Sequence, residues 1–252
     1  MTGMFADKLR RAIWVIAIIG LSSAVAVATD VGERLAGAQA APRESGRKPL
    51  ERNTRITRAL IVEAQQRLSD LGYWAGGIDG KWGESSRHAL VAFQKVEQRK
   101  RTGRLTIDEL TALRNAARPV PREANVAHIE VDLDRQVLFM VEASGTVSKI
   151  LPVSTGNGKS FKIEGETDIA VTPVGRFRVY RKLEGWRKSK LGLLYYPNYI
   201  LGGIAIHGNP SVPAQPASHG CIRIPMFASE EFSRIAPVGT QVIVYKGSMA
   251  SP

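Results

Sequence analysis

Residues 202–224 read Gly-Gly-Ile-Ala-Ile-His-Gly-Asn-Pro-Ser-Val-Pro-Ala-Gln-Pro-Ala-Ser-His-Gly-Cys-Ile-Arg-Ile, and they form the most informative pattern in the chain. It holds the only cysteine of the chain, Cys221, and two of its four histidines, His207 and His219. The apolar run before His207 predicts a short buried strand with the histidine at its end, and the alternation from Cys221 onward predicts a second strand. The proline-rich segment between them has no apolar period, which indicates a loop.

A cysteine beside histidines can act as a nucleophile. The thiolate is the reactive form, and its ordinary pKa of about 8.5 falls when an imidazole or a positive group lies near. We therefore expect His207 or His219 to lower the pKa of Cys221 and to exchange a proton with it, with Arg223 adding positive charge. Gly220, which lacks a side chain, would let a substrate carbonyl approach the amide N–H groups near Cys221 and form an oxyanion hole with them. This set of groups is typical of acyl transfer.

Two other interpretations of these residues remain open. A lone cysteine is often a buried small hydrophobe with no chemical role. His207, His219 and Cys221 are also zinc ligand types, although the sequence shows no fourth ligand. His88, on the surface of a predicted helix, and His128, before a predicted strand, lie outside the constellation and are interpreted as structural.

The run Ser218-His219-Gly220-Cys221-Ile222-Arg223, preceded by His207, resembles the signature of the L,D-transpeptidases with a YkuD-like catalytic domain. That signature is a histidine followed by Ser/Thr-His-Gly-Cys, a hydrophobic residue, and Asn or Arg. Val153-Ser154-Thr155-Gly156 and Thr172-Pro173-Val174-Gly175-Arg176-Phe177 are also similar to the family. The family is bacterial and acts on peptidoglycan, and its catalytic domain would cover residues 126–247.

The resemblance implies a role for each residue of the signature. Cys221 would be the nucleophile that accepts the acyl group of a stem peptide, and His207 the general base and acid. The product would be an L,D (3-3 type) cross-link made through a Cys221 thioester, with stem peptides as donor and acceptor and with no metal or organic cofactor. Supporting, oxyanion or substrate-binding roles would fall to Gly208, Ser218, His219, Gly220 and Arg223.

Two rival functions share this sequence. The same acyl-enzyme resolved by water would make the protein an L,D-carboxypeptidase, and the loop between His207 and Ser218, shorter than in many members, leaves the acceptor side open. Alternatively, the chain would be a non-catalytic cell-wall-binding protein. The intact His207, His219 and Cys221 argue against the latter.

Residues 1–40 have the layout of an export signal or an N-terminal anchor. Lys8, Arg10 and Arg11 precede an apolar run of 16 residues, 13–28, and small residues follow. A spanning helix needs about 20 apolar residues, so cleavage is favoured over a membrane anchor. We expect an extracytoplasmic protein, in the cell wall or periplasm. Since the chain has a single cysteine, its thiol cannot form an intramolecular disulfide.

Charge is spread along the chain rather than concentrated. The 35 basic and 23 acidic side chains give a net charge of +12. Of this excess, 1–56 carries +4, 57–116 carries +3 and 117–252 carries +5. This distribution argues against a nucleic-acid partner and suits a protein near anionic lipid or wall polymer.

A charged segment without periodicity, 41–56, predicts a flexible tether, and residues 57–116 predict a three-helix module. A glycine-rich loop, 76–83, separates the first two helices. Thr106 and Glu109 predict a capping box at the start of the third. Sixty residues give a marginal core for a free-standing domain.

The module resembles the small peptidoglycan-binding domain that accompanies wall enzymes. The resemblance rests on Leu71-Gly72-Tyr73, Ile78-Asp79-Gly80-Lys81-Trp82-Gly83 and Ala92-Phe93-Gln94. It implies that the module binds the wall and is dispensable for chemistry on a soluble muropeptide. Asp79 and its glycines could instead simply form a turn, since Asp-Gly is a common turn dipeptide.

From residue 117 the pattern changes from helical to period two. A proline-containing linker, 117–125, precedes the mostly β domain, and one short helix is expected near 226–235. The polar, glycine-rich stretch 156–169 predicts a loop. Aromatic and basic residues over 183–199 indicate either a lid or packing on the sheet. The predicted fold is therefore multidomain, a small α module followed by a mostly β catalytic domain.

Overall fold

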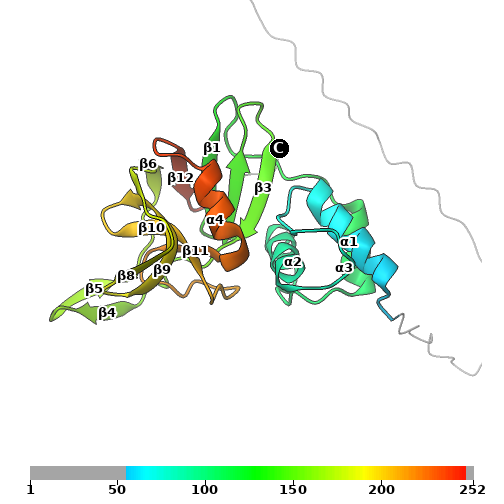
Figure 1. Ribbon diagram of the computed structural model, residues 1–252, viewed down its shortest axis with the longest axis horizontal. Coiled ribbons are helices and arrows are strands. Elements are labelled where there is room, and N and C mark those ends of the chain that lie inside the picture. The colour runs from blue at the N-terminus through cyan, green and yellow to red at the C-terminus, as the bar shows by residue number, and fades with distance from the viewer. Residues whose placement is uncertain (1–54, 248–252) are drawn as a thin grey trace, which may run out of the picture. The chain divides into compact units, whose positions relative to one another are not determined.

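The computed structural model describes residues 55–247 (Figure 1). The predicted export signal or anchor, 1–40, and all but the last two residues of the predicted tether lie outside the described residues. Within 55–247, no helix combines the length and the apolar character needed to cross a membrane.

Three helices form the module, as predicted: α1 (Arg58–Asp70), α2 (Glu84–Val96) and α3 (Ile107–Asn115). The Thr106 hydroxyl caps α3 by accepting from the Glu109 N–H. The Glu109 side chain instead pairs with Arg99, whose Nε lies 3.0 Å from its Oε2, so only half of the predicted capping box forms.

The glycine-rich loop of the module is held by one buried side chain of α1. Gln65 is 1% exposed, and its Nε2 donates to Asp79 Oδ1 and Lys81 O, both at 3.0 Å. Its Oε1 accepts from the Gly80 N–H at 2.9 Å. A single amide therefore satisfies both sides of the turn, which gives this loop a clear structural role.

The β domain, from residue 126 onward, contains a five-stranded sheet in the order β3-β2-β1-β12-β6. Its strands are β1 (His128–Asp132), β2 (Val137–Val141), β3 (Val147–Pro152), β6 (Gly175–Arg178) and β12 (Gln241–Tyr245). β1 and β12 run parallel, and the other pairs are antiparallel.

A second sheet runs β11-β10-β9-β7, with β8 also paired to β9. Its strands are β7 (Arg181–Lys182), β8 (Trp186–Ser189), β9 (Gly192–Leu201), β10 (Ile204–Asn209) and β11 (Ile222–Pro225). The predicted short helix is α4 (Met226–Ile235), which packs on β9, β10 and β11. Apolar side chains of both sheets and α4 form one core, which includes Ile129, Leu138, Ile206, Ile222 and Phe232.

Residues 156–169 are not the loop that we predicted. They contain a hairpin of β4 (Ser160–Ile163) and β5 (Glu166–Ile169) that is separate from both sheets (Figure 1). Its residues are exposed or half-buried, so no apolar face marks the strands in the sequence. The register, which pairs Ser160 with Ile169, is therefore held by backbone bonds and the turn rather than by burial.

Both faces of β2 are buried, each against a different partner. Val137, Phe139 and Val141 pack into the core of the helical module, whereas Leu138 packs against the second sheet. Successive side chains of β2 therefore point into two different cores. The module's core, marginal for 60 residues alone, is completed by side chains of β2 and β3.

The backbone also joins the module to the first sheet. The Ile150 N–H of β3 donates to Gly72 O at 2.8 Å, and the Trp74 N–H donates to Ile150 O at 3.0 Å, so residues 72–74 extend the sheet edge. The segment predicted as a linker is anchored as well. Arg118 donates to Val147 O at 2.8 Å, and Glu123 N donates to the buried Glu130.

Two histidines lie away from the predicted site. His88 is not on the helix surface, as we expected, but is 7% exposed and faces Phe227 of α4 with ring centroids 6.2 Å apart. The reason is that the β domain covers this side of α2. His128 is buried, with Nε2 2.9 Å from Glu130 Oε1 and Nδ1 2.6 Å from Val126 O.

Candidate active site

Parallel pairing of β10 with β11 brings the sequence-predicted residues together. In this register Ile206 lies beside Ile222 and His207 beside Arg223, so the histidine sits on the strand adjacent to the residues that follow Cys221. His207 lies inside β10 rather than at its end, because the strand continues to Asn209. The loop 210–217 connects the two strands.

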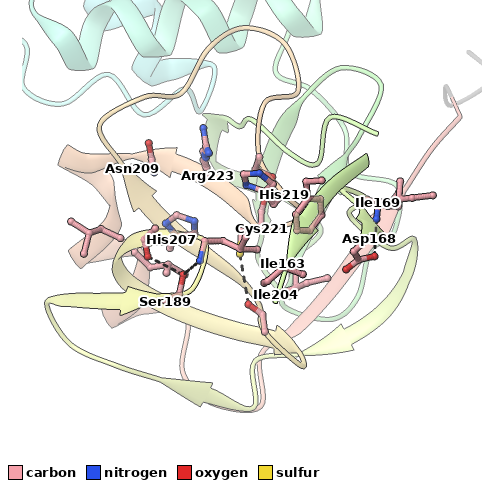
Figure 2. A pocket seen from close by; sticks show the side chains of 18 of the residues that line it. Ile163, Asp168, Ile169, Ser189, Ile204, His207, Asn209, His219, Cys221 and Arg223 are labelled. Carbon is pink, nitrogen blue, oxygen red and sulfur yellow. Dashed lines mark hydrogen bonds between the residues drawn. The ribbon is translucent and has the colours of Figure 1, made fainter. Parts of the chain in front are cut away.

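A pocket of about 530 Å³ opens in front of these strands (Figure 2). Five of the seven predicted site residues line it: His207, Ser218, His219, Cys221 and Arg223. Gly208 and Gly220 do not line the pocket. They instead shape the backbone of the strand and of the turn that carry the lining residues. The remaining walls come from the β4–β5 hairpin, the β8–β9 hairpin and the start of β10.

His207 is held in one orientation. It is 4% exposed, and its Nδ1 lies 2.9 Å from Gly208 O, so Nδ1 carries the proton and donates to this carbonyl. Burial lowers the pKa of His207 to about 4, the hydrogen bond to Gly208 opposes this, and the charge of Arg223 lowers it further. The imidazole is therefore neutral at pH 7, with an unprotonated Nε2 available as a base.

Gly208 supplies the carbonyl that orients His207, and its lack of a side chain is required by the packing of α4. A Cβ on Gly208 would lie 2.4 Å from the hydroxyl oxygen of Ser229 on α4. Ser229 is itself fully buried and donates to Met226 O at 2.8 Å, so it has little freedom to withdraw. The glycine thus lets α4 lie directly against the strand that carries His207.

Cys221 is half-buried, and its Sγ lies 3.7 Å from Gly203 O. Burial raises the pKa of the thiol, while the Ala205 N–H and the charge of Arg223 lower it. The neutral imidazole of His207 contributes no such charge, which differs from our expectation that His207 lowers the thiol pKa. The resting pair is a thiol beside a neutral base, so proton transfer must accompany attack.

The turn before the nucleophile is braced by two hydroxyl groups. Ser218 Oγ donates to Cys221 O at 2.5 Å and accepts from the Gly220 N–H at 3.0 Å. Thr172 Oγ1 donates to Gly220 O at 2.7 Å. Gly220 has φ +135°, and a Cβ there would meet Val171 O at 3.0 Å, so this turn requires glycine.

This bracing limits which amide groups could form the predicted oxyanion hole. The Gly220 N–H is taken by Ser218 and cannot also face a substrate oxygen. Among the described residues the Cys221 N–H has no such partner, which leaves it as the available amide. Sequence reasoning missed Thr172 as a support of this turn, although it opens one of the motifs that carried the family resemblance.

Both hairpins beside the pocket contribute to it. Phe161 of β4 packs edge-on against His219, with ring centroids 4.7 Å apart. Ser189, Leu191 and Leu193 of the β8–β9 hairpin also line the pocket, and Ser189 lies across it from Asp168 and Ile169 of β5 (Figure 2). The hairpin tips are joined by Glu164 and Lys190, whose Oε1 and Nζ are 2.5 Å apart.

The two interpretations of residues 183–199 are both partly correct. The segment forms β8 and most of β9, and its tip walls the pocket as a lid would. Its aromatic residues pack mainly on one another, with Trp186 and Tyr195 centroids 4.9 Å apart. No group of three or more His, Cys, Asp or Glu side chains within 55–247 could hold a metal ion, so the zinc interpretation finds no support.

Comparison with known proteins gives two family matches. Residues 126–244 match the model of the L,D-transpeptidase catalytic domain (YkuD), and residues 57–113 match that of a peptidoglycan binding domain. No curated protein matches the chain.

Solved structures are also similar. An L,D-transpeptidase from Xylanimonas cellulosilytica is 40% identical, with a TM-score of 0.70, over 73% of this chain and 92% of that one. An L,D-transpeptidase from Stackebrandtia nassauensis is 22% identical, with a TM-score of 0.44, over 75% of this chain and 91% of that one.

Proposed function

Since the chain belongs to the L,D-transpeptidase family, we propose that it is a cysteine acyltransferase that forms 3-3 cross-links between peptidoglycan stem peptides through a Cys221 thioester. The observation that carries this proposal is the presence of Cys221 and of a neutral, oriented His207 in the lining of one pocket. A nucleophile with a base held by a third group is the arrangement that covalent acyl transfer needs.

The first half-reaction would form the thioester. As Sγ attacks the carbonyl of the diamino-acid residue of the donor stem, the thiol proton passes to His207 Nε2, and the Cys221 N–H donates to the oxyanion. Collapse of the tetrahedral intermediate breaks the amide bond to the terminal D-Ala. His207 returns the proton to the departing amine, so charge and protons balance.

The second half-reaction would resolve the thioester. A neutral side-chain amine of an acceptor stem attacks the thioester carbonyl, His207 Nε2 takes one amine proton, and the thiolate that leaves recovers it as a thiol. Water in place of the amine would give only a shortened stem, which is the carboxypeptidase outcome. Arg223, His219 and Ser218 would shape the electrostatics and the position of the turn rather than transfer protons.

Peptidoglycan is the expected partner of both regions. The helical module would hold the enzyme on the wall and raise the local concentration of stems around the pocket. A protein that acts on this polymer works on the outer side of the cytoplasmic membrane, so we expect it in the periplasm or cell wall.

Muropeptide mass spectrometry tests the proposal. Purified protein incubated with tetrapeptide-stem monomers should produce cross-linked dimers, and its intact mass should show the acyl-enzyme. Cys221→Ala should fold normally and give neither signal, because the change removes one sulfur from a half-buried site. Shortened monomers without dimers would assign the carboxypeptidase reaction instead. A folded wild-type protein that changes nothing would leave only the wall-binding role.

A further inference from the structure

A lysine of the helical module is completely buried where the module packs against the β domain. Lys95, in the last turn of α2, is 0% exposed. Its Nζ donates to Gln136 O at 2.9 Å and to Val153 O at 2.8 Å, carbonyls that lie 41 and 58 residues further along the chain. Both acceptors belong to the catalytic region, so this ammonium joins two regions that the sequence presents as separate.

Packing alone does not call for a lysine here. Burial of an ammonium is costly, and lysine is almost never fully buried unless it is paired. Both hydrogen-bond partners of its Nζ are neutral carbonyls, and burial lowers its pKa to about 7. A methionine would fill similar space without this cost, so the two hydrogen bonds are the feature that lysine adds.

The carbonyls that accept from Lys95 lie next to the backbone that supports the turn at Cys221. Val153 begins the segment 153–155, whose middle residue, Ser154, exchanges two backbone hydrogen bonds with Arg223, at 3.1 and 3.0 Å. Thr155 O accepts from the N–H groups of both Ala217 and Ser218, at 3.0 and 2.9 Å. These bonds fix the nucleophile turn from both sides, because Ser218 braces Cys221 and Arg223 follows it.

The second carbonyl leads to the same segment. Gln136 lies in a turn with φ +61° and is 1% exposed. Its backbone oxygen accepts the hydrogen bond from Lys95 Nζ. Its side chain donates to Thr155 Oγ1 at 2.7 Å and accepts from the Thr155 N–H at 3.0 Å. Lys95 therefore fixes segment 153–155 directly at Val153 and, through Gln136, at Thr155.

From these contacts we infer that Lys95 is a positioning residue, through which the helical module fixes segment 153–155 and, with it, the placement of Cys221 relative to His207. The module is then part of the catalytic apparatus as well as a wall anchor. A second contact acts in the same direction, since Arg101 of the module donates to Ala214 O of the loop 210–217 at 3.2 Å.

The test compares Lys95→Met with Leu113→Ala. Leu113, in α3, is 0% exposed in the core that the module shares with β2 and β3, so its truncation weakens this core without touching segment 153–155. Both proteins are first shown to be folded by near-ultraviolet circular dichroism and thermal melting. The readout is the rate of Cys221 alkylation by iodoacetamide, which needs no natural substrate. The rate falls when the turn moves the thiol away from the Ala205 N–H and the charge of Arg223, the two groups that lower its pKa.

Lys95→Met should slow alkylation at least fivefold, whereas Leu113→Ala should leave it within twofold of wild type. With stem peptide, Lys95→Met should lower kcat with KM within twofold, because geometry and not donor binding is altered. A folded Lys95→Met protein with wild-type alkylation would overturn the inference, and so would equal slowing by Leu113→Ala.

If Lys95→Met does not fold, Lys95→Gln is compared in its place. Its side chain is one atom shorter and carries no ammonium, so it cannot keep both hydrogen bonds, and it is judged by the same fivefold and twofold limits. The kinetic arm rests on the proposed function, whereas the alkylation arm does not. Failure to form any product would therefore count against the proposed reaction and leave the role of Lys95 to be decided by alkylation.

Discussion

Gly208 O lies 2.9 Å from Nδ1 of His207, the residue that immediately precedes it, so the strand that carries the imidazole also fixes its tautomer. With the pKa lowered to about 4 from an ordinary 6.5, the base form of His207 should persist well below neutral pH. We expect the acid limb of kcat/KM near pH 4, measured as the rate of acyl-enzyme formation against pH. An acid limb near 6.5 would contradict this assignment.

Because the imidazole of His207 is neutral, replacing His207 and replacing His219 should have different effects. His207→Ala should abolish most turnover but barely move the pKa seen in iodoacetamide alkylation, because a neutral ring exerts no charge effect on the thiol. His219→Ala, which removes a ring packed on Phe161, should reduce turnover less. If His207→Ala instead raises the alkylation pKa by a full unit, the resting site is an ion pair and the order of proton transfer must be revised.

Arg223 should control both titrations. Its charge lowers the pKa of Cys221 and that of His207, so Arg223→Gln should move the alkylation curve and the acid limb of activity in the same direction, toward higher pH. Arg234→Gln, on the exposed side of α4, is the matched control and should move neither. Opposite shifts of the two curves would show that Arg223 acts through structure rather than charge.

Deletion of the module should destroy the fold of the catalytic region. Without residues 57–116, five apolar side chains now at most 4% exposed would face water: Val137, Phe139, Val141, Val147 and Ile150. At about 1.5 to 3 kcal/mol each, their exposure would cost about 7 to 15 kcal/mol, comparable to the whole stability of a domain. The shared core thus replaces our expectation from sequence that the module is dispensable for chemistry.

The measurement is circular dichroism and solubility of residues 117–247, compared with residues 55–247. The shorter fragment should aggregate or lack a cooperative melt. A soluble fragment that melts cooperatively and still acylates would show that the sheet is stable without its helical cover.

Stability should fall in mild acid. His207 and His88 both have pKa values lowered by burial to about 4. Between pH 6.5 and 4 the unfolded chain takes up protons that the folded chain does not, so the free energy of unfolding decreases as pH falls through this window. Each histidine contributes up to about 3 kcal/mol. Urea titrations of wild type and His88→Gln at pH 7 and 4.5 should show a smaller pH effect in the variant; equal effects would contradict the assignment.

Sequence patterns predicted those parts of the fold that burial controls. Alternation over 129–141 marked β1 and β2 because their side chains enter two cores, and the Ser-His-Gly-Cys run marked the turn at Cys221. The β4–β5 hairpin was missed because no face of it is buried. Lys95 was missed for a related reason: a lysine in a helix is normally exposed, and only the tertiary structure shows that β-domain carbonyls surround it.

The contact between Glu164 and Lys190 bridges the tips of the two hairpins that contribute to the pocket. A stem that is attached to a long glycan chain cannot be threaded beneath a closed bridge from one end. Both side chains of this contact are about two-thirds exposed, however, and an exposed ion pair contributes only about 0 to 1 kcal/mol. Thermal energy is therefore enough to break this ion pair. A stem peptide that is still attached to its glycan chain can then reach the pocket from the side.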